Sequence, residues 1–388
     1  MMKKILFIFL ISSISINAQT FIPYYADVAN QCSSTNILNN LTQFENFGVK
    51  YRGTTAQSNT LNWLRNQYLS YGYTNAQVLE YTYSYSGATC KNLEVTKTGT
   101  LYPNTYVIVC GHFDTINGPG TNDNGSGVIT ILEIARLLQN IPTEYSIKFI
   151  NFSGEEDGLR GSQNYVNTVV NSTTPKMDIR LVFNIDEVGG VAGEINNTIT
   201  CEKDTGSPTA NNAASAQFTN ELITCVGHYS TLNTLLANAY GSDYMSFEEN
   251  GEIITGFYET NESNYPHSAN DLLVNIDVNY LYQVCKAAIG GTLHFSKAVT
   301  ALSNNDIAID EQIIIYPNPA KDNINISLGK LSSFNNLISI YDVNGKLISQ
   351  KNTSLYIETI DTSNFSSGIY ALRVENEKYT FIKKISIE

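Results

Sequence analysis

The stretch from Tyr106 to Thr115, YVIVCGHFDT, decides the fold of this 388-residue chain, because an apolar run ends abruptly in polar residues. A short apolar run of this kind is typical of a strand that is buried on both faces of a sheet. A glycine-rich loop follows, and from Gly127 to Leu138 apolar residues recur at helical spacing. The sequence therefore predicts a strand, a loop and a helix, in the order from which parallel sheets are built.

The same order recurs on either side of this stretch. Ser146–Phe152 and Arg180–Ile185 are further runs of the buried-strand type, and Tyr280–Phe295 has helical spacing. Alternating strands and helices favour an α/β fold, with a doubly wound, mostly parallel sheet and helices on both of its faces. We expect residues 19–301 to form this domain.

The pattern of the sequence changes after residue 301. Residues 302–310 are expected to be a linker. From Ile313 onward, short alternating runs are separated by turn signals such as Asn344-Gly345 and Ser367-Gly368, and helical periodicity is absent. Residues 311–388 are therefore predicted to form a small all-β sandwich.

Residues 1–18 have the features of a secretory signal peptide. Lys3 and Lys4 give a positive start, an apolar run follows, and Ala18 is a small residue before Gln19. This run is too short for a membrane anchor, and no later run is long enough to span a bilayer. We expect the protein to be secreted or held at the cell surface after passing the periplasm, where its six cysteines can be oxidised.

The formal net charge of the chain is -13. An acidic chain repels nucleic acid and anionic lipid, so we expect no nucleic-acid partner. No C-x-x-C pair occurs among the cysteines, which removes support for zinc-finger chemistry.

Residues that can bind a metal follow the predicted strands. His112 stands at the carboxyl end of the first strand, where open α/β sheets place their sites. Asp114 can accept the other ring N–H of a metal-binding histidine and so fix its tautomer. A strand-end histidine that is only hydrogen-bonded would show the same pattern.

Carboxylates supply the next candidates. Asp123 lies in a tight loop between glycines, where one carboxylate can reach two metals, although the same loop could simply begin a helix capped by Asn124 or Ser126. Glu155 and Glu156 are adjacent, and a nearby cation relieves their repulsion. One can bind metal while the other takes a proton from water. The alternative is an exposed acidic turn.

Two further segments complete the set. Asp186 follows the third strand, and His267 follows the strand-like run Ile253–Tyr258. Each segment is a weak signal alone. Together they give the order His, Asp, Glu-Glu, Asp, His in a chain with four histidines, and this order suits a pair of cations such as zinc.

These segments resemble those of the zinc-dependent aminopeptidase family of bacterial leucyl aminopeptidases, which also includes aminopeptidase Y-like and glutamate carboxypeptidase-like members. The resemblance covers about residues 40–300. The matching segments are GHFDT (111–115), GTNDNGSG (120–127), SGEEDGLRGS (153–162), NIDEVGG (184–190) and PHSAND (266–271). The resemblance implies a zinc-exopeptidase fold, two zinc ions per chain, and peptide or protein substrates.

The resemblance also implies a role for each residue. Asp123 would bridge the two ions. The residues completing the two sites would be His112 and Asp186 for one ion, and Glu156 and His267 for the other. Glu155 would be the general base of peptide hydrolysis, and Asp114 would support His112.

The sequence departs from the family at Glu187, where many aminopeptidases have Met. This side chain could bind a substrate amine or be a bystander. Tyr240 and Tyr244 lie in a segment that lines the pocket in the family, and either could support an oxyanion. His228 and His294 are expected to be structural.

Three alternatives to an aminopeptidase remain open. A carboxypeptidase needs cations for the substrate carboxylate, and Arg160 and Arg180 are the arginines near the motifs. Glutaminyl cyclases share the fold but use a single zinc. A catalytically inactive, receptor-like binding protein would lack a ligand or the base.

The C-terminal region carries a second resemblance, to the sorting domain of the type IX (Por) secretion system. The matching segments are IYPNPA (315–320), IYDVNGK (340–346), SGIYALR (367–373) and KKISI (383–387). This resemblance implies the type IX machinery as a partner. The alternative is an adhesive or carbohydrate-binding sandwich.

Overall fold

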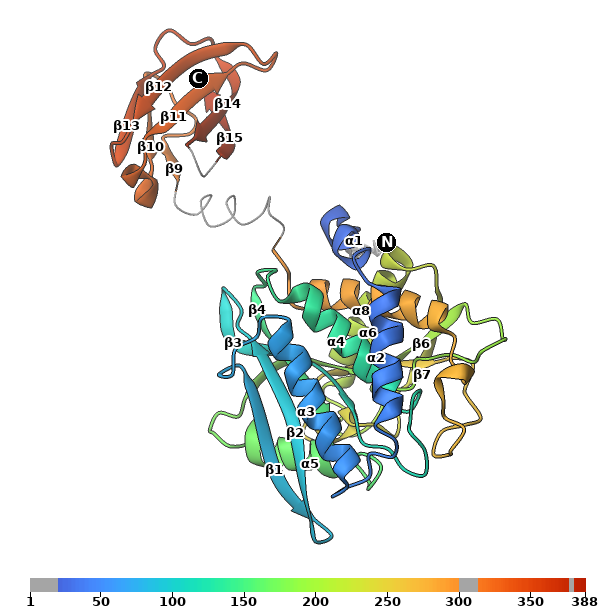
Figure 1. Ribbon diagram of the computed structural model, residues 1–388. Coiled ribbons are helices and arrows are strands. Elements are labelled where there is room, and N and C mark those ends of the chain that lie inside the picture. The colour runs from blue at the N-terminus through green and yellow to red at the C-terminus, as the bar shows by residue number, and fades with distance from the viewer. Residues whose placement is uncertain (1–19, 300–312, 377–379) are drawn as a thin grey trace, which may run out of the picture. The chain divides into compact units, whose positions relative to one another are not determined.

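The structure is a computed structural model that describes residues 20–299, 313–376 and 380–388. The expected signal peptide and linker, residues 1–18 and 302–310, lie outside the described residues. The chain divides into two compact units on either side of the bond between Ala298 and Val299 (Figure 1). Each unit is described by itself.

The first unit is built on an eight-stranded sheet with the order β1-β2-β4-β3-β5-β8-β6-β7. In chain order its strands are β1 (Val78–Tyr85), β2 (Ala88–Lys97), β3 (Tyr102–His112), β4 (Tyr145–Phe152), β5 (Asp178–Ile185), β6 (Thr198–Lys203), β7 (Asn233–Asn238) and β8 (Ile254–Glu259).

The centre of this sheet is parallel. Strand β3 pairs in parallel with β4 and with β5, and β5 pairs in parallel with β8. Toward the edges, β1, β2 and β4 are joined by antiparallel pairs, and β6 runs antiparallel to β8. The predicted α/β fold is confirmed, and β3, β4, β5 and β8 all end at the same edge of the sheet.

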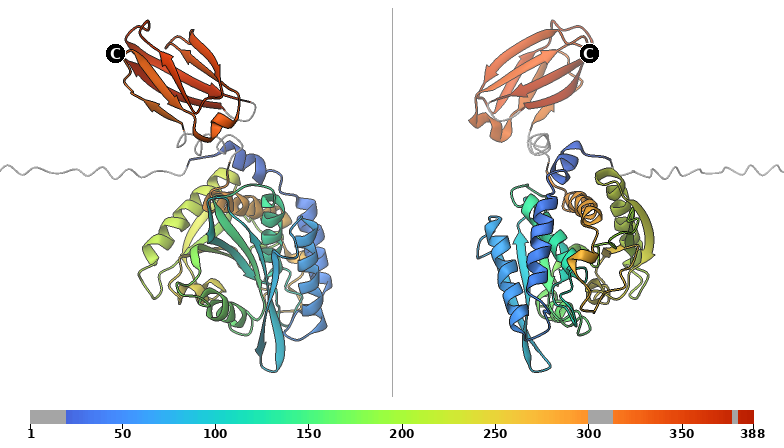
Figure 2. Two further views of the ribbon diagram at one scale, coloured as in Figure 1. Left: turned by 90° about the vertical axis from the view of Figure 1, so that its left-hand side faces the viewer. Right: turned by 45° about the vertical axis from the view of Figure 1, so that its right-hand side comes forward.

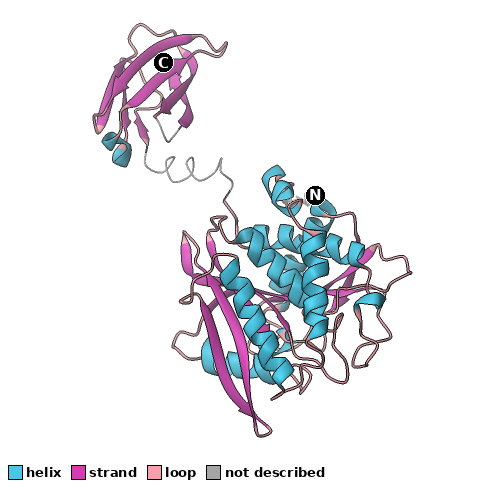
Figure 3. Ribbon diagram, in the orientation of Figure 1, coloured by secondary structure: helices cyan, strands magenta, loops and turns pink. Residues whose placement is uncertain are grey.

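The helices of this unit lie against the sheet, as the separate colours for helices and strands show (Figure 3). They are α1 (Pro23–Ala29), α2 (Ser34–Asn46), α3 (Thr55–Ser70), α4 (Gly125–Leu138), α5 (Arg160–Tyr165), α6 (Asn212–Tyr229), α7 (Tyr244–Glu248) and α8 (Val278–Phe295), with the short helices η1 (Val166–Val170) and η2 (Leu273–Asn275).

Alternation along β3 explains why helices cover both faces of the sheet. Val107 and Val109 belong to a large core that also includes buried residues of α4, α6 and α8. Ile108 and Cys110 point to the opposite face and join a second core with residues of α5 and α7. Successive strand residues face opposite sides, so a run that is apolar throughout must be covered twice. The two layers of helices are visible from two further directions (Figure 2).

The second unit contains only β-strands and one short helix among its described residues. They are β9 (Ile314–Tyr316), β10 (Asn323–Ser327), η3 (Gly329–Ser333), β11 (Asn336–Tyr341), β12 (Leu347–Thr353), β13 (Ile357–Asp361), β14 (Gly368–Glu375) and β15 (Thr380–Ile387).

These strands form two antiparallel sheets, with the orders β13-β10-β9 and β12-β11-β14-β15. One apolar core joins them, because Ile324 and Ile326 from the first sheet pack with Ile338, Leu372 and Ile385 from the second. The predicted all-β character of this region is confirmed.

Two properties bear on the expected export of the chain. Among the described residues, no helix combines the length and the apolar character that crossing a membrane requires. All six cysteines are buried, and none of them is joined in a disulfide.

Candidate metal centre

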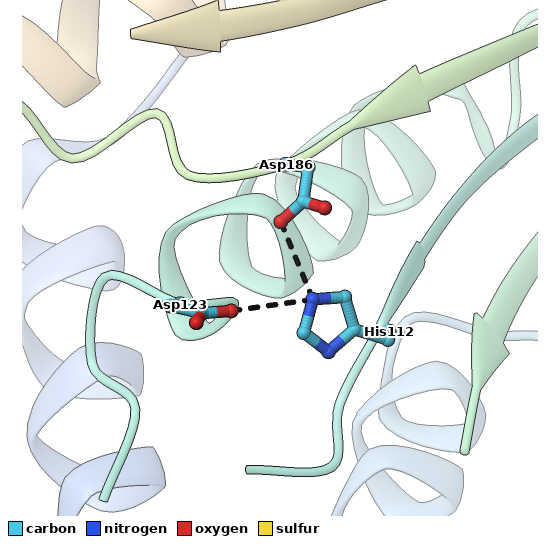
Figure 4. A group of neighbouring side chains, drawn as sticks. All are labelled: His112, Asp123 and Asp186. Atoms are coloured by element: carbon cyan, nitrogen blue, oxygen red, sulfur yellow. Dashed lines mark ion pairs between the residues drawn. The ribbon is translucent and has the colours of Figure 1, made fainter. Parts of the chain in front are cut away.

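Three side chains from separate elements meet at the edge of the sheet where the parallel strands end. His112 is the last residue of β3, Asp186 directly follows β5, and Asp123 lies in the loop before α4. The Nε2 atom of His112 lies 3.3 Å from Asp123 Oδ1 and 3.3 Å from Asp186 Oδ1. Figure 4 shows the two carboxylates converging on this single ring nitrogen.

A second group of three side chains shares Asp123. The Nε2 atom of His267, in the loop after β8, lies 3.1 Å from Asp123 Oδ2 and 2.8 Å from Glu156 Oε2. Asp123 therefore turns one oxygen toward each histidine. In each group, the possible ligand atoms all lie within 4.8 Å of one another.

The donor atoms of both groups fit zinc. A ring nitrogen carries at most one hydrogen, so neither histidine can donate to both of its carboxylates, whereas one cation can bind all three side chains. Two buried oxygens, Glu156 Oε1 and Asp186 Oδ1, have no hydrogen-bond partner among the described residues. Histidine nitrogens and carboxylate oxygens are zinc ligands, and two groups sharing Asp123 suit two ions.

The charges of the site are unbalanced. Burial and, after it, the negative charge of Asp123 together raise the pKa of Glu156 to about 9. The pKa of Asp123 falls to about 2, because hydrogen bonds from His112 and His267 outweigh the opposing effect of burial. Several carboxylates thus share two histidines, and additional positive charge at this place would stabilise them.

Glu155 lies beside these groups without belonging to either of them. Burial raises its pKa well above the usual range, and the charge of Asp243 adds to the increase, against the positive effect of His112. A buried carboxyl with a raised pKa is the type of group that accepts and returns protons near neutral pH.

The structure differs from the expectation for Asp114. Its Oδ1 lies 3.8 Å from His112 Nδ1, which is too far for a hydrogen bond, and that ring nitrogen lies 3.1 Å from the main-chain oxygen of Asp114. The carboxylate instead accepts the backbone N–H groups of Glu155, at 3.2 Å, and of Glu156, at 3.4 Å. These two N–H groups compete with His112 for the carboxylate of Asp114, which explains why it lies so far from the ring. The carboxylate fixes the turn that carries both glutamates instead.

Asp271 is a supporting residue that sequence reasoning quoted within a motif but gave no role. Its carboxylate accepts the backbone N–H of Asn122 at 2.7 Å and that of Asp123 at 3.0 Å. Asp271 lies about a hundred and fifty residues after Asn122 in the chain, so no pattern in the sequence connects the two. Only its position four residues after His267 indicated that it could lie near the site.

Ser242 is a second supporting residue that sequence reasoning missed. Its hydroxyl donates to Asp186 Oδ2 at 2.5 Å and accepts from the side chain of Asn184 at 2.8 Å. These two contacts hold Asp186 from a segment that precedes α7.

The start of α4 brings Asp123 and Asp186 together. Asn124 caps the helix by accepting the N–H of Gly127 at 2.9 Å, as the simpler interpretation of this loop expected, and it also donates to Ile185 O at 2.9 Å. A Cβ atom on Gly127 would lie 2.2 Å from Ile185 O, so only glycine allows the helix to approach the end of β5 this closely.

The remaining candidates lie as follows. Tyr244 is buried and donates to Glu202 at 2.7 Å, whereas the side chain of Tyr240 is 84% exposed. Glu187 has a buried oxygen, Oε2, without a hydrogen-bond partner among the described residues. His294 hydrogen-bonds to the hydroxyl of Tyr229 at 2.7 Å, in keeping with a structural role.

Comparison with known families gives two matches. A family model described as peptidase family M28 matches residues 92–290. A model described as a secretion system C-terminal sorting domain matches residues 314–388.

Several of the curated relatives that match are aminopeptidases by name. Aminopeptidase YwaD of Bacillus subtilis is 42% identical over 84 residues, which cover 21% of this chain and 18% of the relative. Probable leucine aminopeptidase 2 of Aspergillus fumigatus is 39% identical over 87 residues, which cover 22% of this chain and 17% of the relative. The matched segment of this chain thus spans less than a fifth of the length of each of these two relatives.

Solved structures show the same fold. The Legionella pneumophila aminopeptidase LapA has a TM-score of 0.63 at 21% identity, over 77% of this chain and 81% of the other. An aminopeptidase from Aneurinibacillus sp. strain AM-1 has a TM-score of 0.59 at 15% identity, over 71% of this chain and 97% of the other.

Proposed function

The chain belongs to peptidase family M28, and we propose that it is a secreted exopeptidase that holds two zinc ions and removes N-terminal residues from peptides. The family match spans just over half of the chain and includes all five proposed ligands and Glu155.

The observation that carries this proposal is the position of Asp123 between two histidines. Its Oδ1 faces His112 and its Oδ2 faces His267. One ion would be held by His112, Asp123 and Asp186, and the other by His267, Asp123 and Glu156. A carboxylate shared in this way is how two ions are brought to act on one substrate atom.

Zinc held at these residues would lower the pKa of a water molecule and stabilise negative charge that develops on the scissile carbonyl oxygen. Glu155 would accept the proton of the attacking water and return it to the leaving amine, for which its raised pKa is suited. Asp114 would keep Glu155 and Glu156 in place through their backbone N–H groups. Ser242 would hold Asp186 in the same way.

The charge of the site favours a substrate with a free amine. Glu187 adds another carboxyl beside Asp123 and Asp186. Burial is the largest cause that raises the pKa of Glu187 to about 10, and the negative charges of Asp123 and Asp186 add to it. A surplus of carboxylates attracts the cationic N-terminus of a peptide and repels a C-terminal carboxylate. The names of the matched relatives, YwaD and leucine aminopeptidase 2, point to the same substrate end.

The carboxypeptidase alternative loses one of its two candidate cations. Arg180 lies near the start of β5, whereas Asp186 follows the end of that strand. The guanidinium of Arg180 donates to Phe295 O and packs on the ring of Tyr145. Arg160 stays close to the glutamates but donates to Asp157 O and Gln163 Oε1. A cluster that would bind a substrate carboxylate does not arise from these two residues.

The second part of the proposal concerns the path of the chain to the cell exterior. We propose residues 1–18 as a cleaved signal peptide, 19–301 as the catalytic domain, 302–310 as a linker and 311–388 as the sorting domain. The sorting-domain match to residues 314–388 supports export through the type IX machinery after passage through the periplasm.

A panel of amino-acid p-nitroanilides tests the proposed activity, with N-acetylated versions of the same compounds as controls. We expect the zinc-loaded protein to cleave only the compounds with a free α-amine, and to lose this activity when a chelator removes the metal. Cleavage of N-acetylated compounds, or activity that persists without metal, would contradict the proposal. No cleavage by zinc-loaded protein would favour a carboxypeptidase, a glutaminyl cyclase or an inactive binding protein.

A further inference from the structure

Asp204 and Glu248 form a pair of buried carboxylates outside the proposed zinc centre. Asp204 directly follows β6, and Glu248 is the last residue of α7. Each side chain is 2% exposed, although residues 205–210 of the loop that follows Asp204 are exposed. The pair therefore lies next to an exposed loop of the surface.

Both carboxylates lie beside Gly206. Asp204 Oδ1 accepts the backbone N–H of Gly206 at 2.7 Å. A Cβ atom on Gly206 would lie 2.5 Å from Glu248 Oε1 and 3.4 Å from Asp204 Oδ1, so both carboxylates point toward this loop residue. Burial, together with the negative charge of Asp204, raises the pKa of Glu248 to about 7.

Nothing among the described residues balances this pair. Asp204 Oδ2 and Glu248 Oε1 are buried, and neither has a hydrogen-bond partner there. Neither residue forms an ion pair with a described lysine, arginine or histidine, and the charge of Glu249, like that of Asp204, raises the pKa of Glu248. Ionised carboxylates are acceptors only and repel each other, so a shared proton or a cation beside them would stabilise the pair.

Further unpartnered oxygens lie where the loop ends. Asn211, which is 6% exposed, and Asn212 each have a side-chain oxygen without a hydrogen-bond partner among the described residues. Asn212 is tied to the loop through its amide, which donates to Gly206 O at 3.2 Å, and the amide of Asn211 donates to Glu252 O at 2.6 Å, four residues after Glu248. Two unpartnered amide oxygens thus belong to residues at the end of the short loop that begins at Asp204.

We propose that Asp204 and Glu248, with amide oxygens of the 204–212 loop, bind a hard divalent cation of the calcium type. The donors are oxygens alone, without the histidine nitrogens that characterise the proposed zinc centre, and calcium prefers oxygen ligands in flexible arrangements. A cation here neutralises the two buried carboxylates and joins the loop to α7.

This site would act on stability through α7. The segment that leads into this helix carries Ser242, which donates to Asp186 Oδ2, and the helix ends at Glu248. A cation that fixes Glu248 therefore holds one end of the short helix, while the hydrogen bond to Asp186 holds the other. The calcium site is distinct from the zinc centre, so its test does not depend on peptidase activity.

Calcium titration of the zinc-loaded full chain, followed by thermal unfolding, tests this proposal. The protein is first stripped with a chelator, dialysed and reloaded with zinc alone. We expect calcium to bind with a stoichiometry of one per chain in a calorimetric titration. Calcium at about a hundredfold excess over its dissociation constant should raise Tm by about 5 °C, and magnesium at the same concentration should raise it less.

Variants separate this site from others. Asp204→Asn and Glu248→Gln should each abolish the calcium-dependent rise in Tm, whereas Glu249→Gln, which removes the same charge from the exposed neighbouring position, should retain it. A wild-type protein whose Tm does not respond to calcium overturns the proposal, as does an Asp204→Asn variant that responds like the wild type. If Glu248→Gln alone raises Tm and calcium has no effect, the two carboxylates share a proton instead.

Discussion

Asp123 is the residue on which both ligand groups of the proposed centre depend, since each of its oxygens faces a different histidine. The neighbouring residues divide the remaining tasks. Glu156 belongs to one ligand group, whereas the adjacent Glu155 belongs to neither and has a raised pKa. Two carboxylates in sequence can thus serve two purposes, one in binding and one in proton transfer.

Replacement of Glu155 tests this division. We expect Glu155→Gln to retain zinc, because the five proposed ligands remain, and to lose about 10²–10⁴-fold in kcat, because the amide cannot accept the proton. Zinc content by mass spectrometry and turnover of a p-nitroanilide are the two measurements. Glu262→Gln, an exposed acid in the loop that carries His267, is the matched control and should keep normal turnover. A Glu155→Gln enzyme that turns over normally would remove Glu155 from the proposed mechanism.

The sequence predicted the residues that lie at strand ends better than those that support them. His112, Asp123, Glu156, Asp186 and His267 stood out because each follows an apolar run or a glycine-rich loop, and the structure brings all five together. Ser242 and Asp271 carry no such local pattern. They act through hydrogen bonds to residues more than fifty positions away, and such contacts exist only after the chain has folded.

At the scale of elements, the loop between β3 and α4 positions Asp123. Its backbone is held from two distant segments, since Asp271 accepts the N–H groups of Asn122 and Asp123, and Lys50 donates to Pro119 O at 2.6 Å. A loop fixed by buried hydrogen bonds keeps its carboxylate at a defined place, as a shared ligand requires.

Asp271 is therefore expected to affect metal affinity without binding metal itself. We predict that Asp271→Ala weakens zinc binding by about 10–100-fold, because two buried N–H groups lose their acceptor. Asp271→Asn keeps one acceptor oxygen and should lose less. Competition with a zinc indicator measures the affinity. Equal zinc affinity in the wild type and Asp271→Ala would show that the loop keeps its shape without this carboxylate.

The packing of α8 against α6 predicts a dependence of stability on pH. Burial lowers the pKa of His294 to about 4, and the charge of His228 contributes in the same direction. Below pH 6.5 the imidazole of His294 therefore binds a proton in the unfolded chain, whereas in the folded chain it binds one only near pH 4. Folding stability contributed by this residue is present above pH 6.5 and is lost as the pH falls through this range.

Urea unfolding of the wild type and of His294→Gln at several pH values checks this expectation. The free energy of unfolding of the wild type should fall more steeply between pH 6.5 and pH 4 than that of the variant, because the amide does not titrate. Comparison of the two proteins cancels the titration of the carboxylates near the zinc centre. Parallel curves would mean that His294 titrates normally in the folded protein.

The predicted elements were those whose pattern is strongest. The runs Tyr106–Cys110, Ser146–Phe152 and Arg180–Ile185 became the central strands β3, β4 and β5, because strands buried on both faces must be apolar throughout. The strands toward the two edges of the sheet were not predicted. Strand β7 has exposed residues along most of its length, and β1 alternates irregularly, so neither shows the pattern of a buried strand.

At the scale of the whole molecule, each unit has its own core. The apolar clusters of the first unit contain only residues up to Ala298, and the cluster of the second begins at Ile313. Domains with separate cores can fold and act separately. The change in sequence pattern after residue 301 predicted the all-β character of the second unit, because turn signals and short alternating runs replace helical periodicity there.

Deletion of residues 302–388 tests the separate tasks of the units. We expect the shortened protein, purified from a cytoplasmic expression host and loaded with zinc, to cleave a p-nitroanilide at a rate close to that of the full chain, because no residue proposed for catalysis is removed. In the native bacterium the same deletion should abolish appearance of the enzyme outside the cell. A shortened protein that is still exported would favour an adhesive or carbohydrate-binding role for the C-terminal sandwich.

The most direct test of the central claim is an anomalous diffraction map, recorded at the zinc absorption edge from crystals of the zinc-loaded protein. The account predicts two peaks on either side of Asp123, one beside His112 and Asp186 and the other beside His267 and Glu156. A single peak, or peaks that do not contact Asp123, would contradict the proposal that this carboxylate joins two zinc sites.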